Sequence, residues 1–377
     1  MPTQVSLQRC GDYSSENVMQ AVRAALEPFG GMGAIVKPGE TVLLKPNMLA
    51  PAAPEKAVTT HPAVVKAVAQ LVMESGGKPF IGDSPAVPGF KMTAKKTGLA
   101  AVAEELGIPL AELKNSAEYK QGENKLFRIL EISKTALEAD RIINLPKLKT
   151  HSQMYMTLGV KNIFGCVVGS RKSQWHFKAG IDRVFFARML VELYDAVSPD
   201  ITIMDGIVGM EGDGPGPGGT PRQCGIISAA TDAVAMDRVL LDMAGGDTEN
   251  LFTIAAAREM GIGETDLARI RVMGVPLEEL KMERFVFPQV VGVLMGPKFL
   301  QKLFIDNLTP KPKELRKTCT LCEQCINICP TDVISARNDR LHFDYDRCIR
   351  CFCCVEVCPE GSMKPSSPLL LKLVAGK

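Results

Sequence analysis

Short apolar runs alternate with amphipathic patterns along most of the chain. Six of these runs are rich in β-branched residues, as expected of strands that are buried on both faces of a sheet. We predict strands at Thr41–Lys45, Lys78–Asp83, Arg141–Leu145, Ile201–Asp205, Cys224–Ser228 and Arg269–Met273. Periodicity and end signals predict helices at Ser15–Phe29, His61–Ser75, Asp182–Val197 and Asp232–Ala244. This alternation is typical of an α/β fold with a mainly parallel sheet and helices on both faces.

A change in composition at Thr309–Thr318 indicates a domain boundary. This stretch, TPKPKELRKT, is rich in Pro and Lys and has few large apolar residues, which is typical of a linker. We therefore predict an α/β ligand-binding domain at 1–308, a linker at 309–318, a small cysteine-rich domain at 319–365 and a surface tail at 366–377.

Nine of the twelve cysteines lie between Cys319 and Cys358, in two runs that share the spacing C-x2-C-x2-C-x3-C-P. Such clustering beside a large apolar core argues against a disulfide scaffold and favours thiolate ligands in a reducing cytoplasm. The runs CTLCEQCINICP and CIRCFCCVEVCP resemble the bacterial-type ferredoxin module, which holds two [4Fe-4S] clusters. A pair of four-cysteine zinc sites is the alternative, although zinc sites usually pair two C-x2-C knuckles.

The ferredoxin resemblance implies that the fourth cysteine of each run ligates the cluster held by the other run. The implied ligands are Cys319, Cys322, Cys325 and Cys358 for the first cluster, and Cys348, Cys351, Cys354 and Cys329 for the second. Cys353 is left over, and we interpret it as a small buried residue beside the cluster, with a ligand-swapping role as the alternative. We interpret Cys166 in the same way, as a small buried side chain.

Polar side chains follow four of the predicted strands. In open parallel sheets, ligands bind beyond the carboxyl ends of the strands, so these side chains predict a shared crevice. The candidates are Lys45, Asn47, Asp83, Lys147, Lys149, His151 and Asp205, together with Lys161 and Asn162 further along the chain. Scattered solvated loops are the alternative.

The segment INLPKLKTH is the richest of these strand ends. Lys147, Lys149 and His151 alternate, so an extended backbone would point all three to one side. We predict that the two lysines hold an anionic or carbonyl ligand and that His151 donates a proton. Asp83 or Asp205 would orient a partner or bind a metal. A lysine-rich exposed turn is the alternative, and the glycine-rich segment 211–221 is either a mobile lid or a flexible connection.

Composition narrows the class of protein. The formal net charge is +2, and basic residues are interspersed with acidic ones, which argues against nucleic-acid binding. The N-terminus is polar, and the apolar stretch Phe285–Leu300 is interrupted by Gly, Pro and Lys. We expect a cytoplasmic protein that binds neither nucleic acid nor membrane. The sequence contains no phosphate-binding loop or dinucleotide fingerprint that we recognise.

Six longer motifs resemble the domain-of-unknown-function family 362, which often carries a ferredoxin module. These motifs are LLKPN, TTHPAVV, GDSP, INLPKLKTHSQMYMTLGVKNIFGCVVG, MDGIVGMEGDGPGPGG and AMDRV. They contain the polar candidates named above. The resemblance implies a ligand-binding α/β domain fused to an electron-transfer module, and it names no substrate.

These observations favour an iron–sulfur oxidoreductase. Two clusters would carry electrons between an external donor or acceptor protein and a small anionic or carbonyl compound in the crevice. One alternative is a non-catalytic electron carrier whose large domain docks partners. Another is a cofactor- or metal-handling protein in which the clusters sense redox state.

The ligand count makes a prediction about metal content. Two [4Fe-4S] clusters require about eight irons and about eight sulfides per chain. Iron and acid-labile sulfide should reach these values in protein that is purified and reconstituted without oxygen. Zinc in place of iron, or about half the iron after full reconstitution, would contradict the assignment.

Overall fold

The computed structural model describes residues 2–85, 89–169, 171–288 and 310–366. A ten-stranded sheet forms its centre, with the order β12-β1-β11-β10-β7-β2-β3-β4, and β8 and β9 join it beside β10. Its strands are β1 (Thr3–Arg9), β2 (Thr41–Pro46), β3 (Lys78–Asp83), β4 (Leu110–Glu112), β7 (Arg141–Leu145), β8 (Lys147–His151), β9 (Tyr155–Met156), β10 (Ile201–Gly212), β11 (Gly219–Ala230) and β12 (Ile270–Gly274). Most neighbours are parallel, whereas β11 is antiparallel to β1 and β10, and β9 is antiparallel to β8.

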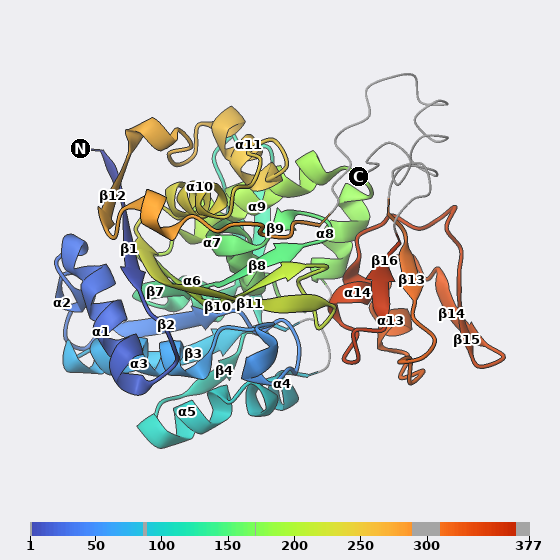
Figure 1. Ribbon diagram of the computed structural model, residues 1–377, viewed down its shortest axis with the longest axis horizontal. Helices are drawn as coiled ribbons and strands as arrows, with labels where there is room; N and C mark the ends of the chain where they lie inside the picture. Colours follow the sequence, from blue (N-terminus) through green and yellow to red (C-terminus); the bar gives the residue numbers. More distant parts are fainter. Residues whose placement is uncertain (1, 86–88, 170, 289–309, 367–377) are drawn as a thin grey trace.

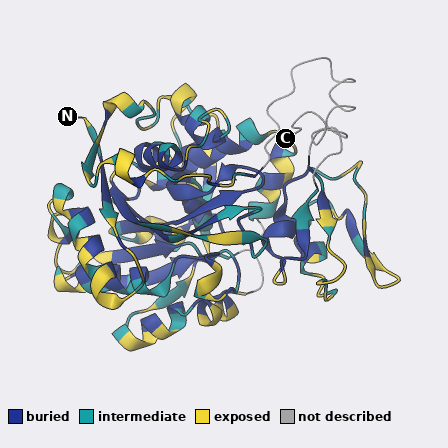
Figure 2. Ribbon diagram, in the orientation of Figure 1, coloured by how far each residue is buried: buried dark blue, intermediate teal, exposed yellow. Residues whose placement is uncertain are grey.

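Helices cover both faces of this sheet (Figure 1), so the predicted α/β architecture is confirmed. One face packs against α1 (Ser15–Leu26), α3 (Pro62–Glu74) and α5 (Leu99–Leu106), and the other against α9 (Arg183–Val197), α10 (Ala233–Met243) and α11 (Phe252–Met260). The shorter helices are α2 (Met32–Ile35), α4 (Phe90–Lys96), α6 (Lys134–Glu138), α7 (Leu158–Asn162) and α8 (Arg171–Ala179). A hairpin of β5 (Ser116–Lys120) and β6 (Ile129–Ser133) stands apart from the sheet. Figure 2 shows the central strands as the most continuously buried part of the molecule.

Short polar side chains begin the longer helices, as the sequence predicts. The Asp182 carboxylate accepts a hydrogen bond from the Phe185 backbone, and Asp232 accepts bonds from Val234 and Ala235. Each bond satisfies a backbone N–H that the first turn leaves without a partner. The predicted helix 15–29 ends earlier, at Leu26, because Pro28 lies in a following 3-10 turn at Glu27–Phe29.

All six predicted strands lie largely within observed strands, but the surroundings of Asp205 were predicted incorrectly. Strand β10 continues to Gly212, so Asp205 lies inside the strand and does not follow it. At this point the parallel neighbour of β10 changes from β7 to β8. The long β10–β11 hairpin accounts for the difference, because its ladder resumes after a register shift beyond Gly206.

The cysteine-rich part forms a small module at one end of the sheet (Figure 1). Its elements are β13 (Pro312–Glu314), α13 (Gln324–Asn327), β14 (Ile334–Arg337), β15 (Arg340–Phe343), α14 (Cys353–Glu356) and β16 (Met363–Pro365). β13 pairs with β16, so part of the predicted linker is a strand of this module. Thr309 and the tail from 367 lie outside the described residues, as does most of the apolar stretch 285–300.

The glycine-rich turn between β10 and β11 contacts the cysteine module. A Cβ atom at Gly216 would lie 2.9 Å from the backbone oxygen of Glu356 and 3.1 Å from that of Val355. Across the same contact, a Cβ atom at Gly361 would lie 3.0 Å from the Pro217 oxygen. The glycines therefore allow the backbones of the two modules to approach closely.

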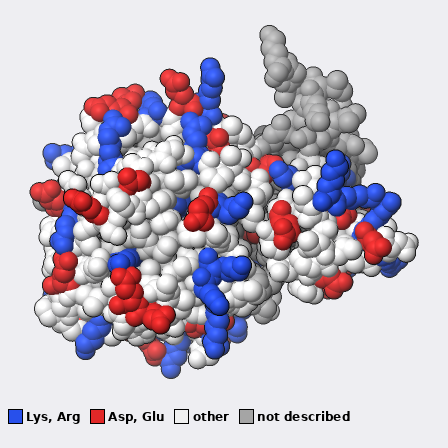
Figure 3. All heavy atoms as spheres, turned by 60° about the horizontal axis from the view of Figure 1, so that its bottom comes forward, with Lys and Arg blue, Asp and Glu red and all other residues white. Residues whose placement is uncertain are grey.

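The surface and the helix lengths add two observations. Lys and Arg side chains alternate with Asp and Glu over the face in Figure 3, in keeping with the small net charge. Among the described residues, no helix combines the length and hydropathy that crossing a membrane requires.

The close approach at Gly216 predicts that Gly216→Ala will loosen the contact between the modules. The added methyl group has no room, and overpacking typically costs about 1–3 kcal/mol. Amide hydrogen exchange in 353–356 and 147–151 should become faster in the variant. Gly33→Ala is the control, because the nearest atom to its Cβ is 4.0 Å away. Equal exchange in the two variants would contradict the prediction.

Candidate functional site

A buried ion pair forms where β2 and β3 end side by side. Lys45 Nζ lies 3.2 Å from Asp83 Oδ1, and both side chains are almost fully buried. Asp83 also accepts hydrogen bonds from the backbones of Met48, at 2.8 Å, and Ser84, at 2.7 Å. These bonds keep the carboxylate next to the lysine, as expected from two neighbouring parallel strands.

An asparagine network extends from this pair. Asn47 Nδ2 donates to Asn162 Oδ1 at 2.9 Å, and Asn162 Nδ2 donates to the Lys45 carbonyl at 3.1 Å. Lys149 Nζ donates to Asn47 Oδ1 at 2.9 Å and to the Val58 carbonyl. Burial is the main reason that the pKa of Lys149 lies well below its usual value. Both oxygens that accept hydrogen bonds from Lys149 belong to uncharged groups, the Asn47 amide and the Val58 carbonyl.

Helix α7, which carries Lys161 and Asn162, is positioned by a buried carboxylate. Asp237 accepts hydrogen bonds from the backbones of Gly159, at 2.7 Å, and Val160, at 3.0 Å. Burial raises the pKa of Asp237 to about 8, although these two bonds oppose the shift. The Asp237 contacts hold residues 235–239 (AMDRV) next to residues 157–162 (TLGVKN).

Lys147 and Asp205 form a second buried ion pair. Lys147 Nζ lies 2.8 Å from Asp205 Oδ2 and donates to the Tyr13 hydroxyl at 2.8 Å. That hydroxyl donates to Asp205 Oδ1 at 2.9 Å, and the backbone of His61 donates to Oδ2 at 2.8 Å. Asp205 is therefore fully engaged by protein groups.

His151 reaches across to the cysteine module. Its Nδ1 accepts from the backbones of Gln153, at 3.1 Å, and Met154, at 3.2 Å, so the ring proton of the neutral form lies on Nε2. Nε2 lies 2.8 Å from Glu356 Oε1. Burial lowers the pKa of His151 to about 4, so the ring is neutral near pH 7. In this geometry His151 lies against Glu356, and the proton donation expected of it stays a prediction.

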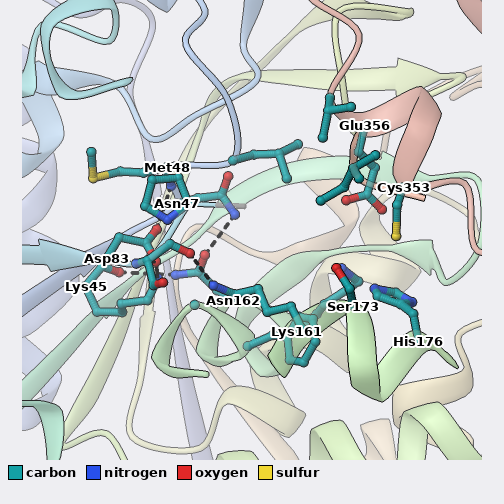
Figure 4. Close-up of a pocket in the computed structure, with 18 residues that line it drawn as sticks. Lys45, Asn47, Met48, Asp83, Lys161, Asn162, Ser173, His176, Cys353 and Glu356 are labelled. Atoms are coloured by element: carbon teal, nitrogen blue, oxygen red, sulfur yellow. Dashed lines mark hydrogen bonds and ion pairs between the residues drawn. The ribbon is translucent and has the colours of Figure 1, made fainter. Parts of the chain in front are cut away.

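A pocket lies between the sheet domain and α14, and its volume is about 80 Å³. That volume accommodates a few water molecules or one small compound. Figure 4 shows its walls, to which both modules contribute. The polar side chains that line it are those of Lys45, Asn47, Asp83, Ser84, Lys161, Asn162, Lys172, Ser173, His176, Cys353 and Glu356.

Among the described residues, Lys161 is a lysine of the pocket that no carboxylate pairs with directly, although the charge of Glu356 acts on it through space. No hydrogen bond or ion pair reaches its Nζ within the described ranges, and the Phe164 ring centroid is 5.9 Å away. Burial lowers the pKa of Lys161 below its usual value, which an anion bound beside it would reverse. Lys172, in contrast, donates to the Ser84 carbonyl.

The structure separates the predicted crevice residues into two groups. Lys45, Asn47, Asp83, Lys161 and Asn162 line the pocket. Lys147, Lys149, His151 and Asp205 are buried behind it, in the hydrogen-bonded networks described above. The roles predicted for these four side chains stay predictions; in the structure, their polar atoms lie against buried neighbours.

Sequence analysis missed several residues that line the pocket. Cys353 and Glu356 belong to the distant cysteine module, and no local pattern connects them with the sheet. Lys172 and His176 lie shortly after the recognised motif, in the segment SRKSQWH, whose polar side chains are visible in the sequence.

The cysteine module brings the predicted ligands together. Cys319, Cys322, Cys325 and Cys358 line one cavity of about 20 Å³. Cys348, Cys351, Cys354 and Cys329 lie within electrostatic range of one another on the more buried side. In the described ranges, no three His, Cys, Asp or Glu side chains are grouped for a single metal ion. Thiols gathered in this way fit the donor chemistry of iron–sulfur clusters.

Comparison with known proteins identifies both parts. Residues 42–242 match the family described as domain of unknown function (DUF362), and residues 311–359 match a 4Fe-4S dicluster domain. The chain belongs to the DUF362 family. Its second part is a ferredoxin-type 4Fe-4S domain, which supports iron–sulfur electron transfer. The family resemblance predicted from the motifs is therefore confirmed.

Several known proteins resemble this chain over part or most of its length. A thylakoid-associated protein of Synechocystis is 42% identical over 291 residues, which are 77% of this chain and 89% of that protein. The electron transport protein HydN of Escherichia coli is 40% identical over 52 residues, which are 12% of this chain and 30% of HydN. A lactate racemase apoprotein of Thermoanaerobacterium thermosaccharolyticum superposes with a TM-score of 0.42 and 12% identity, over 62% of this chain and 55% of that chain.

The geometry around the Lys45–Asp83 pair predicts the effect of Gly165→Ala. A Cβ atom at Gly165 would clash with Asp83 Oδ1 and Lys45 Cε. The ion pair must shift, and we expect a loss of about 1–3 kcal/mol in the free energy of unfolding. Denaturant titration of the anaerobic protein measures it.

The control variant for this experiment is Gly11→Ala. A Cβ atom at Gly11 meets nothing within 4 Å. Equal stability of the two variants would show that the pair is not packed as described.

Proposed function

We propose that this protein passes electrons through two [4Fe-4S] clusters to a small anionic, carbonyl-bearing compound in the pocket between its modules. The observation that carries the proposal is the position of α14. This helix contributes Cys353 and Glu356 to the pocket, and it also contains Cys354, an implied ligand of the second cluster. Electrons on that cluster would therefore have a short path to a bound compound.

The exposure of the cysteines supports a direction for the path. Cys322, an implied ligand of the first cluster, is exposed, whereas Cys351, an implied ligand of the second, is buried in one cluster with Cys353, which lines the pocket. An external reduced protein would donate to the first cluster, and the second cluster would face the ligand. Two clusters that each supply one electron provide the pair that converts a carbonyl to an alcohol, and two protons come from solvent.

The charges in the pocket support the ligand class. Lys161 offers a cation that no carboxylate of the described residues pairs with directly, Asn47 and Asn162 offer amide groups nearby, and the volume limits the compound to a few non-hydrogen atoms. Asp83 and Asp205 are each paired with a lysine, which does not favour the alternative of metal handling.

Glyoxylate tests the proposal, because it joins a carboxylate to a carbonyl in a small molecule. The protein is reduced anaerobically with dithionite, freed of excess reductant and mixed with glyoxylate while cluster absorbance is recorded. We expect reoxidation in the wild-type protein and reoxidation about ten- to hundredfold slower in Lys161→Met. A hydrogen bond to a charged group contributes about 1.5–3 kcal/mol, and 1.4 kcal/mol corresponds to tenfold.

Lys178→Met is the matched control, because Lys178 is exposed on α8 and stands over the Trp175 ring. It should react at the wild-type rate with the same iron content. If glyoxylate leaves the clusters reduced while an external acceptor protein reoxidises every variant equally, the electron-carrier alternative holds.

A further inference from the structure

The spare cysteine, Cys353, lies where the pocket meets the second set of cysteines. Its side chain is 7% exposed and lines the pocket. It also packs with Ile328, Cys351 and Val357, and its thiol is within hydrogen-bonding reach of the Cys351 sulfur. One thiol therefore contacts an implied cluster ligand on one side and the ligand space on the other.

The same part of the pocket contains polar groups without protein partners. His176 is 4% exposed, and its Nδ1 has no hydrogen-bond partner among the described residues. In Figure 4 the Cys353 sulfur points toward the side of the pocket where His176 lies. Buried polar groups normally have partners, so this unpaired nitrogen indicates a polar ligand within reach of Cys353.

We propose that Cys353 couples occupancy of the pocket to the reduction potential of the second cluster. The inference rests on the proposed function, because it requires an anionic ligand beside Cys353. When the pocket is empty, the thiol donates a hydrogen bond to the Cys351 sulfur. Hydrogen bonds to cluster sulfurs tune the potential, and a donor stabilises the more negative, reduced state.

An anionic oxygen in the pocket competes for the same S–H group. When the thiol turns to the ligand, the Cys351 sulfur loses its donor and the potential of the second cluster falls. The step moves one hydrogen bond; no covalent bond forms or breaks, and the thiol keeps its proton. The cluster thus becomes a stronger reductant when a compound is present to receive the electrons.

Thermodynamic linkage makes this coupling reciprocal. A ligand that lowers the potential must bind the oxidised protein more tightly than the reduced protein. A tenfold ratio of the two affinities corresponds to 59 mV for a one-electron couple. We expect a ratio of about tenfold in the wild-type protein.

The test is a redox titration of the anaerobic holoprotein, followed by electron paramagnetic resonance, with and without oxalate. Oxalate is a small dianion that the clusters do not reduce. Oxalate should lower the potential of the second cluster in the wild-type protein. Cys353→Ala should have a lower potential without oxalate and a smaller oxalate-induced shift, leaving only the repulsion between charges. Cys353→Ser keeps a donor and should keep the shift, and Cys224→Ala is the control at a cysteine outside the pocket.

The outcomes separate this inference from the proposed function. Equal potentials of wild type and Cys353→Ala without oxalate would overturn the inference. So would oxalate binding, measured by calorimetry, that leaves the potential of the wild-type protein unchanged. Failure of oxalate to bind would contradict the proposed function, and the ligand-free comparison would then decide the inference alone.

Iron content shows whether the variants remain interpretable. Cys353→Ala and Cys353→Ser should keep both clusters, whereas Cys322→Ala should lose or convert one. If Cys353→Ser loses as much iron as Cys322→Ala, then Cys353 is itself a ligand and the inference fails. If only Cys353→Ala loses iron, the test uses Cys353→Ser. A second-cluster potential equal to that of the wild-type protein then supports the hydrogen bond, and a lower potential contradicts it.

Discussion

Three lysine side chains are buried at one end of the sheet, and the arrangement of the site depends on how their charges are satisfied. Lys45, Lys147 and Lys149 are each at most 1% exposed. Burying a charge is costly unless it is paired or hydrogen-bonded, and removing one partner of a buried pair costs about 3–5 kcal/mol. The fold therefore has to place an acceptor beside each lysine. Asp83, Asp205 and Asn47 supply these acceptors, each from a different strand or strand end.

This requirement fixes which groups remain for a ligand. The carboxylates that pair with two of the lysines and the amide oxygen that accepts from Lys149 are already engaged, so most of the charge at the strand ends is internal to the protein. Lys161 is different because it lies on α7, and the carboxylate that acts on its charge, Glu356, lies beside His151. The pocket thus combines a hydrogen-bonded floor with a lysine that has no direct partner among the described residues. Such a floor holds its geometry without a ligand, which lowers the entropic cost of binding.

The sequence was sufficient to predict the strands, but it did not reveal which residues contact the polar side chains at their ends. Apolar β-branched runs such as Thr41–Pro46 can be recognised from the local sequence alone. The polar residues after them are correctly located at the sheet edge. What Lys147 contacts depends on Tyr13, which is distant in sequence and carries no motif. The surroundings of His151 could not be predicted for the same reason. Its ring is oriented by two backbone N–H groups and by Glu356, a residue of another module. Alternation in an extended segment predicts a direction for a side chain, but it cannot reveal whether another chain segment already occupies that direction.

Residues of both modules form the pocket. Its walls include Lys45 and Asn162 from the sheet domain and Cys353, Glu356 and Val357 from the cysteine module, so neither part forms it alone. Gly216 and Gly361 let the backbones meet, and the His151–Glu356 contact fixes the register between β8 and α14. A compound can then be held in this geometry only while the cysteine module is docked. Under the proposed function, ligand binding and electron transfer to the ligand would be coupled, because separating the modules would remove the pocket. It would also lengthen the path from the second cluster to the ligand.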